Sequence, residues 1–220
     1  MVNGKLEFDS VELSYSGREI LRSVHVKCVT GEIIGLLGRN GSGKSSLLKI
    51  VFGKSGATNK SVRYNDQALL GDYMRQNIIA YLPQADLIPS NTTFLKAAEL
   101  YQVDPIKITN TFPDLKESLN RSSGSVSGGQ RRLLEVLLIL FGSHPFCFFD
   151  EPFTGIMPVH IDTLEEVFAS EKKHKGVIIT DHLHKPIRRI CDRLYLLKNG
   201  QTYPIKSEEQ LVLYGYVNEL

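Results

Sequence analysis

Residues 33–46, IIGLLGRNGSGKSS, decide the fold of this chain. The apolar run at residues 33–37 is typical of a strand buried on both faces. Residues 38–45 then fit the pattern G-x-x-x-x-G-K-[ST], and apolar residues recur at helical spacing from residue 44 to about residue 54. A glycine-rich loop between a buried strand and a helix is the context that identifies a phosphate-binding P-loop.

The chemistry of this loop explains its residue types. Glycine permits unusual dihedral angles and lets backbone N–H groups approach a phosphate chain closely. The start of the helix adds a partial positive charge, Lys44 reaches the β and γ phosphates, and the Ser45 hydroxyl is a ligand for Mg²⁺. We therefore expect the nucleotide to contact Gly38, Arg39, Asn40, Gly41, Ser42, Gly43, Lys44, Ser45 and Ser46. An ordinary glycine-rich turn is the alternative.

The rest of the chain predicts an α/β core around this loop. Alternating residues at 5–29 indicate an antiparallel β region, and apolar runs at 78–82, 146–149, 177–179 and 194–197 indicate further strands. Helical patterns at 130–141, 159–173 and 183–191 alternate with them, which favours a mainly parallel sheet. Helical spacing near 94–101 and 114–119, without a convincing strand, predicts a helical lobe at 85–127 inserted into a core of 1–84 and 128–220.

Composition narrows the classes of function. The chain has 220 residues, 42% of them hydrophobic, and a net charge of +2, which is too small to indicate a polyanionic partner, so we expect no nucleic acid. Its three cysteines fall in no metal-binding pattern, which favours a reducing compartment. We find no apolar run near the roughly 18 residues needed to cross a bilayer. If the chain drives transport, the membrane-spanning part must be another polypeptide.

Two carboxylates follow the apolar run at residues 146–149. Ligands of open α/β sheets bind where the strands end, and this places Asp150 to hold Mg²⁺ directly or through water. The neighbouring Glu151 is placed to polarise an attacking water as general base. An apolar strand ending in Asp-Glu is weak evidence alone and becomes strong downstream of a P-loop.

A second glycine-containing loop links the chain to a known family. Ser127, Gly128, Gly129 and Gln130 precede an apolar helix, so a hydroxyl, two glycines and a helix start make another anion site. With Val126 in place of the usual leucine, this segment resembles the signature motif of ABC ATPases. The resemblance implies that the signature of one subunit closes on the ATP held by the P-loop of another. Without the P-loop, the segment would be read as a loop before a helix.

Further positions of the resemblance appear in the family's order. Tyr15 resembles the aromatic residue that stacks on adenine, and Gln84 resembles the glutamine that touches Mg²⁺ or water and links the core to the lobe. His182 resembles the histidine that contacts the γ-phosphate, with His184 as a rival. An ordinary strand tyrosine and a solvated loop glutamine are the alternatives for the first two. Met157 departs from the pattern because it stands where the family has an aspartate before proline.

These observations predict an Mg²⁺-dependent ATPase subunit of an ABC transporter. The resemblance implies a second ABC ATPase subunit as partner, identical or similar, and separate transmembrane permease subunits. It also implies a cytoplasmic location, peripheral on the inner face of the cell membrane. The alternatives are a soluble ABC ATPase for cofactor assembly or for work on nucleic acid or ribosomes, and a nucleotide-binding regulator with low turnover.

Overall fold

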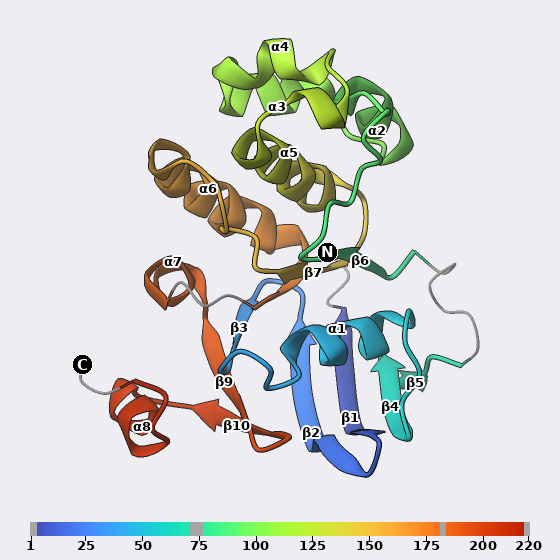
Figure 1. Cartoon of the computed structure of the whole chain (residues 1–220), viewed down its shortest axis with the longest axis vertical. Helices are drawn as coiled ribbons and strands as arrows, with labels where there is room; N and C mark the ends of the chain where they lie inside the picture. The colour runs from blue at the N-terminus through green and yellow to red at the C-terminus, as the bar shows by residue number, and fades with distance from the viewer. Residues whose placement is uncertain (1–3, 71–76, 181–183, 218–220) are drawn as a thin grey trace.

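Two β-sheets form the centre of the molecule, which is described by a computed structural model for residues 4–70, 77–180 and 184–217 (Figure 1). The four-stranded antiparallel sheet has the order β2-β1-β4-β5 and consists of β1 Lys5–Tyr15, β2 Arg18–Val29, β4 Asn59–Tyr64 and β5 Gln67–Ala68. The six-stranded sheet has the order β10-β9-β3-β8-β7-β6 and consists of β3 Ile33–Leu37, β6 Ile79–Leu82, β7 Phe146–Asp150, β8 Gly176–Thr180, β9 Arg193–Lys198 and β10 Gln201–Ile205. All its neighbouring strands are parallel except β10, which runs antiparallel to β9.

Helices connect and cover the strands. They are α1 Lys44–Phe52, α2 Phe94–Leu100, α3 Pro105–Thr111, α4 Lys116–Leu119, α5 Gly128–Phe141, α6 Pro158–Glu171, α7 His184–Ile190 and α8 Glu208–Leu213, with 3-10 turns at Pro113–Leu115, Ser123–Ser125 and Lys172–His174. Local chemistry fixes several starts. The Thr93 side chain accepts a hydrogen bond from the Lys96 amide at the start of α2, and Asp104 caps α3 ahead of Pro105.

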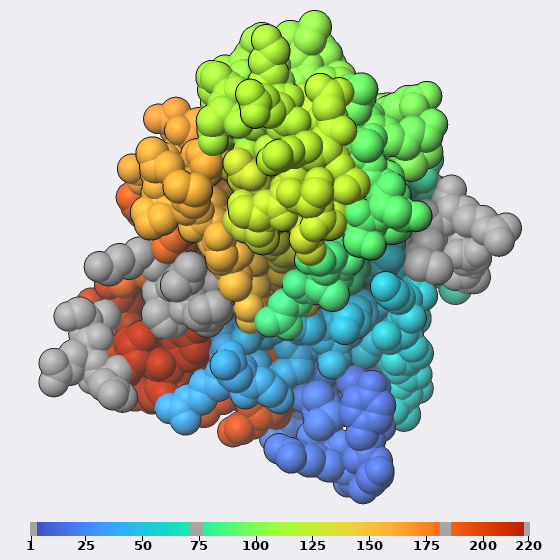
Figure 2. Space-filling model, turned by 45° about the horizontal axis from the view of Figure 1, so that its top comes forward, coloured from blue at the N-terminus to red at the C-terminus, as the bar shows by residue number. Residues whose placement is uncertain are grey.

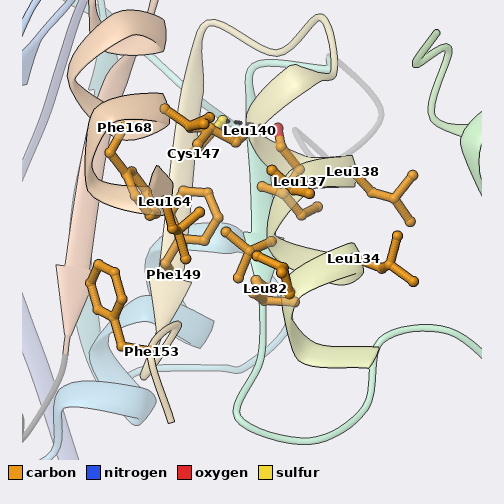
Figure 3. Close-up of a cluster of buried hydrophobic side chains, with 14 of the residues drawn as sticks. Leu82, Leu134, Leu137, Leu138, Leu140, Cys147, Phe149, Phe153, Leu164 and Phe168 are labelled. Carbon is orange, nitrogen blue, oxygen red and sulfur yellow. Dashed lines mark hydrogen bonds between the residues drawn. The ribbon is translucent and has the colours of Figure 1, made fainter. Parts of the chain in front are cut away.

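The strands β3, β6, β7 and β8 of the six-stranded sheet are buried along their whole length, which explains their largely apolar sequences. Along β7, Phe146 and Phe148 join a hydrophobic cluster with α1 and the antiparallel sheet. Cys147 and Phe149 point to the other face and join a cluster with α5 and α6. Figure 3 shows Phe149 beside the α6 side chains, where its ring centroid lies 5.1 Å from that of Phe168, with leucines of α5 closing the cluster from the opposite side. This packing fixes the end of β7, where Asp150 lies.

The predicted α/β class, its mainly parallel sheet and its antiparallel N-terminal region are confirmed. Every strand and helix that the sequence predicted is present, with ends shifted by up to two residues. The strands β4, β5 and β10 and the helices α3 and α8 were not predicted. They are short and largely exposed, and β10 contains Pro204, so their patterns are weak.

The segment between β6 and α5, residues 83–127, is described throughout and contains helices and 3-10 turns but no strand. A single β-bridge joins Thr93 to Ser122. Figure 2 shows this segment, coloured green to yellow-green, as the upper part of the molecule above the blue N-terminal sheet. Within the described ranges no helix is long and apolar enough to span a membrane, and the longest two, α5 and α6, have 14 residues each.

Candidate functional site

The P-loop lies between β3 and α1, as the sequence predicted. Gly41 and Gly43 have φ angles of 77° and 102°, the left-handed region that favours glycine. Gly38 is required for a different reason: a Cβ atom there would lie 2.6 Å from the Ser42 Oγ and 2.9 Å from the Leu197 carbonyl oxygen. The loop therefore keeps its shape only with these three glycines.

Lys44 is buried under the loop that precedes it. Its Nζ donates to the carbonyl oxygens of Gly38 at 2.6 Å and Arg39 at 3.3 Å, so the ammonium group lies inside the curve of the loop. The Ser42 Oγ is buried and has no hydrogen-bond partner among the described parts of the chain. A buried cation next to an unsatisfied hydroxyl and a helix start provides a cradle for an anion.

Arg39 points away from that cradle. Its Nη2 donates to the carbonyl oxygen of Gly215 at 2.7 Å, and the nearby Lys198 Nζ donates to the carbonyl oxygen of Tyr214 at 2.7 Å. Arg39 lines a separate cavity of about 640 Å³ between the loop, β9 and the segment after α8. Its side chain thus joins the P-loop to the C-terminal segment. The nucleotide contact that the sequence predicts for Arg39 stays a prediction, and its backbone N–H would have to make it.

A cleft of about 680 Å³ brings together residues from distant parts of the sequence. Its lining comprises Tyr15, Ile20, Asn40, Gly41, Ser42, Gly43, Lys44, Ser45, Ser46, Gln84 and Glu151. Tyr15 ends β1 and is 60% exposed, so its ring is available for stacking on a flat group. Gly38 and Arg39 do not belong to this lining.

Asp150 is the last residue of β7 and is almost fully buried, at 1% exposure. Its Oδ1 accepts a hydrogen bond from the Thr180 Oγ1 at 2.6 Å, and its Oδ2 accepts one from the Tyr81 hydroxyl at 3.3 Å. Burial, and then the negative charge of Asp150, raise the pKa of Tyr81, so the phenol keeps its proton. Both carboxylate oxygens are therefore held in fixed directions.

Glu151 turns the chain sharply after β7. Its φ of 55° is in the left-handed region, and its amide donates to the Thr180 carbonyl oxygen at 2.7 Å. Its Oε2 accepts a hydrogen bond from the Gln84 Nε2 at 3.1 Å. Gln84 and Glu151, two of the three predicted catalytic residues, are 67 positions apart in sequence but are in direct contact beside the P-loop.

The donor set fits Mg²⁺. The Ser45 hydroxyl, the Asp150 carboxylate and the Gln84 amide are oxygen ligands of the kind this ion accepts. In the ranges that the structure describes, no group of three or more His, Cys, Asp or Glu residues gathers at one point. Mg²⁺ tolerates this because it takes few protein ligands and fills its other positions with water and phosphate oxygens.

The second anion loop does not face this cleft. Ser127 caps α5, its Oγ accepting from the Gln130 amide at 3.3 Å, and none of residues 127–130 lines the cleft. A Cβ atom on Gly129 would lie 2.5 Å from the Gly155 carbonyl oxygen, so the start of α5 packs closely on the loop after Glu151. Met157 is 52% exposed, and its side chain makes no cap for α6. His182 lies outside the described residues.

Four residues of the site were not found from the sequence: Tyr81, Thr180, Arg132 and Glu135. The first two are strand residues whose hydroxyls meet Asp150. Arg132 donates to the carbonyl oxygens of Pro83, Asp150 and Glu151. A usable signal existed for the last two, because Glu135 is a charged residue in the apolar run 133–141 and Arg132 lies one turn before it.

A family model described as ABC transporter matches residues 21–154, which is more than half of the chain. The chain belongs to the ABC transporter family. Among curated relatives, the high-affinity branched-chain amino acid transport ATP-binding protein BraG of Pseudomonas aeruginosa is 31% identical over 211 residues, covering 89% of this chain and 90% of BraG. The lipopolysaccharide export system ATP-binding protein LptB of Acidithiobacillus ferridurans is 28% identical, covering 94% of this chain and 92% of LptB.

Solved structures agree with the fold. An ATP-binding subunit of an ABC transporter superposes with a TM-score of 0.79 at 23% identity, covering 96% of this chain and 93% of that chain. A nucleotide-free ATP-binding cassette gives 0.79 at 20% identity, covering 98% and 100%. Together with the family model and the curated relatives, which are ATP-binding proteins, this identifies the chain as an ATP-binding ATPase subunit.

Proposed function

We propose that this ABC subunit binds Mg-ATP in the cleft at the P-loop and hydrolyses it with Glu151 as general base. The observation that carries the proposal is the contact between Gln84 and Glu151 at the edge of a cleft that also contains Lys44. Lys44 and the backbone of residues 40–46 bind the phosphates, and Tyr15 stacks on the adenine. Glu151 takes a proton from the attacking water, and His182 contacts the γ-phosphate.

Mg²⁺ held by Ser45, Asp150 and Gln84 would neutralise charge developing on the phosphates. Asp150 has its two oxygens oriented by Thr180 and Tyr81, so it presents its lone pairs in fixed directions. Gln84 orients the Glu151 carboxylate through the 3.1 Å hydrogen bond. These residues perform the positioning, which supplies most of the catalysis in phosphoryl transfer.

Residues 127–130 belong to a second site, which we assign to the nucleotide of a partner ABC subunit, identical or similar. The helix start and the Ser127 hydroxyl offer N–H and O–H donors to a phosphate, yet they lie outside this chain's own cleft. Two such subunits therefore enclose two ATP molecules. Closure is driven by the higher affinity of ATP for the closed state.

We propose that residues 85–127 form a helical lobe on a core of residues 1–84 and 128–220. This lobe contacts the separate membrane subunits and couples dimer closure to them. The protein would then lie in the cytoplasm, peripheral on the inner face of the cell membrane. BraG is named for branched-chain amino acid transport and LptB for lipopolysaccharide export. We therefore assign neither cargo nor direction.

Glu151→Gln tests this function. The variant keeps the shape of the side chain but cannot accept a proton, so ATP with Mg²⁺ should trap a stable dimer, measured by light scattering after size exclusion. Glu12→Gln is the matched control, because Glu12 is exposed on β1 and remote from the cleft. A Glu151→Gln protein that retains ATP but stays monomeric points to a nucleotide-binding regulator. A wild-type protein that fails to retain Mg-ATP contradicts the proposal altogether.

A further inference from the structure

Helix α5 carries a buried ion pair that the proposed chemistry does not use. Arg132 and Glu135 are one turn apart, 3.8 Å between charged atoms, with 9% and 1% of each residue exposed. The helix residues between and after them are apolar and largely buried, whereas Arg131, directly before Arg132, is half-buried and pairs with Asp86. Burying two charges is costly unless hydrogen bonds satisfy them, so the partners of this pair show what it holds in place.

Arg132 holds two functional segments together. Its Nη1 donates to the Pro83 carbonyl oxygen at 2.7 Å, immediately before Gln84. Its Nη2 donates to the carbonyl oxygens of Asp150 and, at 3.1 Å, Glu151. One planar guanidinium thus fixes the backbone on both sides of the Gln84–Glu151 contact.

Glu135 binds the other end of residues 83–88, the loop that begins at Pro83. Its Oε1 accepts hydrogen bonds from the amides of Leu87 at 2.8 Å and Ile88 at 3.0 Å. Burial raises the pKa of Glu135, and the two amides and the charge of Arg132 oppose that shift. Loop 83–88 is therefore attached to α5 at its beginning by Arg132 and at its end by Glu135.

The Arg132–Glu135 pair lies on the same helix as Ser127, so a movement of the start of α5 also moves the pair. Ser127 caps the helix five residues before Arg132, which is about 7.5 Å along the axis. A rigid helix moves both positions together. Any displacement of the Ser127 end toward a phosphate is therefore transmitted to Pro83, Asp150 and Glu151 through Arg132.

We propose that Arg132, supported by Glu135, is a positioning residue that places the Glu151 carboxylate according to the seating of the Ser127 end of α5. The inference rests on the proposed function, since it takes Glu151 as the base and Ser127 as the contact to the partner's ATP. Glu151 has a left-handed φ of 55°, a conformation that persists only when its surroundings hold it. Arg132 supplies that hold by binding the carbonyl oxygens before and after this dihedral angle.

Arg132→Lys is the decisive variant. Lysine keeps the positive charge, but a single ammonium group cannot reproduce the planar fork that reaches Pro83 and Glu151 together. We expect kcat of the full-length chain, purified with its membrane subunits, to fall at least about tenfold. KM for ATP should stay within about threefold, because the nucleotide contacts are intact.

Glu135→Leu, which has no acceptor for the Leu87 and Ile88 amides, is the second variant, and we expect the same loss in kcat at an unchanged KM. The double variant should be no slower than the worse single one, because residues that act as a unit are not additive. Lys175→Met is the matched control. Lys175 is also a buried cation that donates to backbone carbonyl oxygens, those of Gly142 and His144, but it lies just before β8, at the other end of the sheet from Glu151.

The control should lower the melting temperature and leave kcat and KM unchanged. All proteins are assayed below their melting temperatures, so unfolding does not enter the rates. If wild-type protein turns over ATP and both α5 variants match it, the positioning role is wrong and the proposed function stands. If the variants lower kcat and raise KM for ATP by similar factors, the whole nucleotide site is disturbed. In that case Arg132 has a structural role only. If wild-type protein in its complex hydrolyses no ATP, the proposed function itself fails.

Discussion

Replacing Gly38 by alanine tests whether the P-loop needs the space that the structure leaves there. The new Cβ would lie 2.6 Å from the Ser42 Oγ and 2.9 Å from the Leu197 carbonyl oxygen, distances that real Cβ atoms essentially never show. The Ser42 hydroxyl can rotate away. The carbonyl oxygen of Leu197 cannot, because Leu197 is paired with Thr202 in the sheet. The P-loop backbone must move instead.

Overpacking of this kind costs about 1–3 kcal/mol. The Gly38 carbonyl oxygen also holds the Lys44 ammonium at 2.6 Å, so a shift of the loop misplaces the main cation of the cradle. If all of the strain falls on the nucleotide-bound conformation, the Kd for ATP rises roughly 5- to 160-fold. Equilibrium binding of a non-hydrolysable ATP analogue measures this, and urea unfolding measures the loss of stability.

Gly56→Ala is the control, because a Cβ at Gly56 meets no atom within 4 Å. We expect its stability to change by less than about 0.5 kcal/mol and its affinity to stay at the wild-type value. A Gly38→Ala protein with wild-type affinity and an unchanged urea midpoint would refute the reasoning. In that case the P-loop backbone can shift to accommodate the added methyl group without loss of affinity or stability.

Three further changes test other parts of the site. Met157→Asp should raise the steady-state ATPase rate of the assembled complex severalfold. A carboxylate can accept charge-assisted hydrogen bonds, worth about 1.5–3 kcal/mol, whereas a thioether cannot. An unchanged rate contradicts this prediction. Thr180→Val should lower the free energy of unfolding by about 1–3 kcal/mol, because it removes the hydroxyl that donates to the buried Asp150 at 2.6 Å. Urea titration measures this loss. Tyr81→Phe removes a longer hydrogen bond, of 3.3 Å, and should lower the free energy of unfolding by less. The fully buried Cys28 and Cys147 should resist a thiol reagent at pH 8 until denaturant is added, since burial raises the pKa of both thiols, that of Cys147 from 9.0 to about 12. For Cys147 the folded pKa exceeds the unfolded one, so this contribution to stability is intact below pH 9 and is lost as the pH rises toward 12.

The sequence predicted those parts of the site in which neighbouring residues in the chain are also neighbours in space. The P-loop is such a part, because Lys44 donates to the carbonyl oxygens of Gly38 and Arg39, which lie six and five positions before it. Asp150 and Glu151 were placed correctly at the end of β7, because an apolar run ending in carboxylates marks the edge of a buried strand. The roles of these residues remain predictions.

Other features depend on contacts between distant segments and could not be predicted. The partners of Arg132 lie up to 49 positions away, so its role appears only when loop 83–88 and β7 meet at α5. Thr180 looks like an ordinary strand residue until β8 pairs with β7 and brings its hydroxyl to Asp150. The side-chain bond of Arg39 could not be predicted either, because its partner, Gly215, is 176 positions away.

The hydrogen bond from Arg39 to Gly215 means that the nucleotide loop is mechanically joined to the segment after α8. A change that displaces Gly215 would therefore also act on the P-loop through this bond. The chain contains no tryptophan, so a tryptophan introduced at Tyr214 would be its sole indole. Its emission would then report directly on the loop.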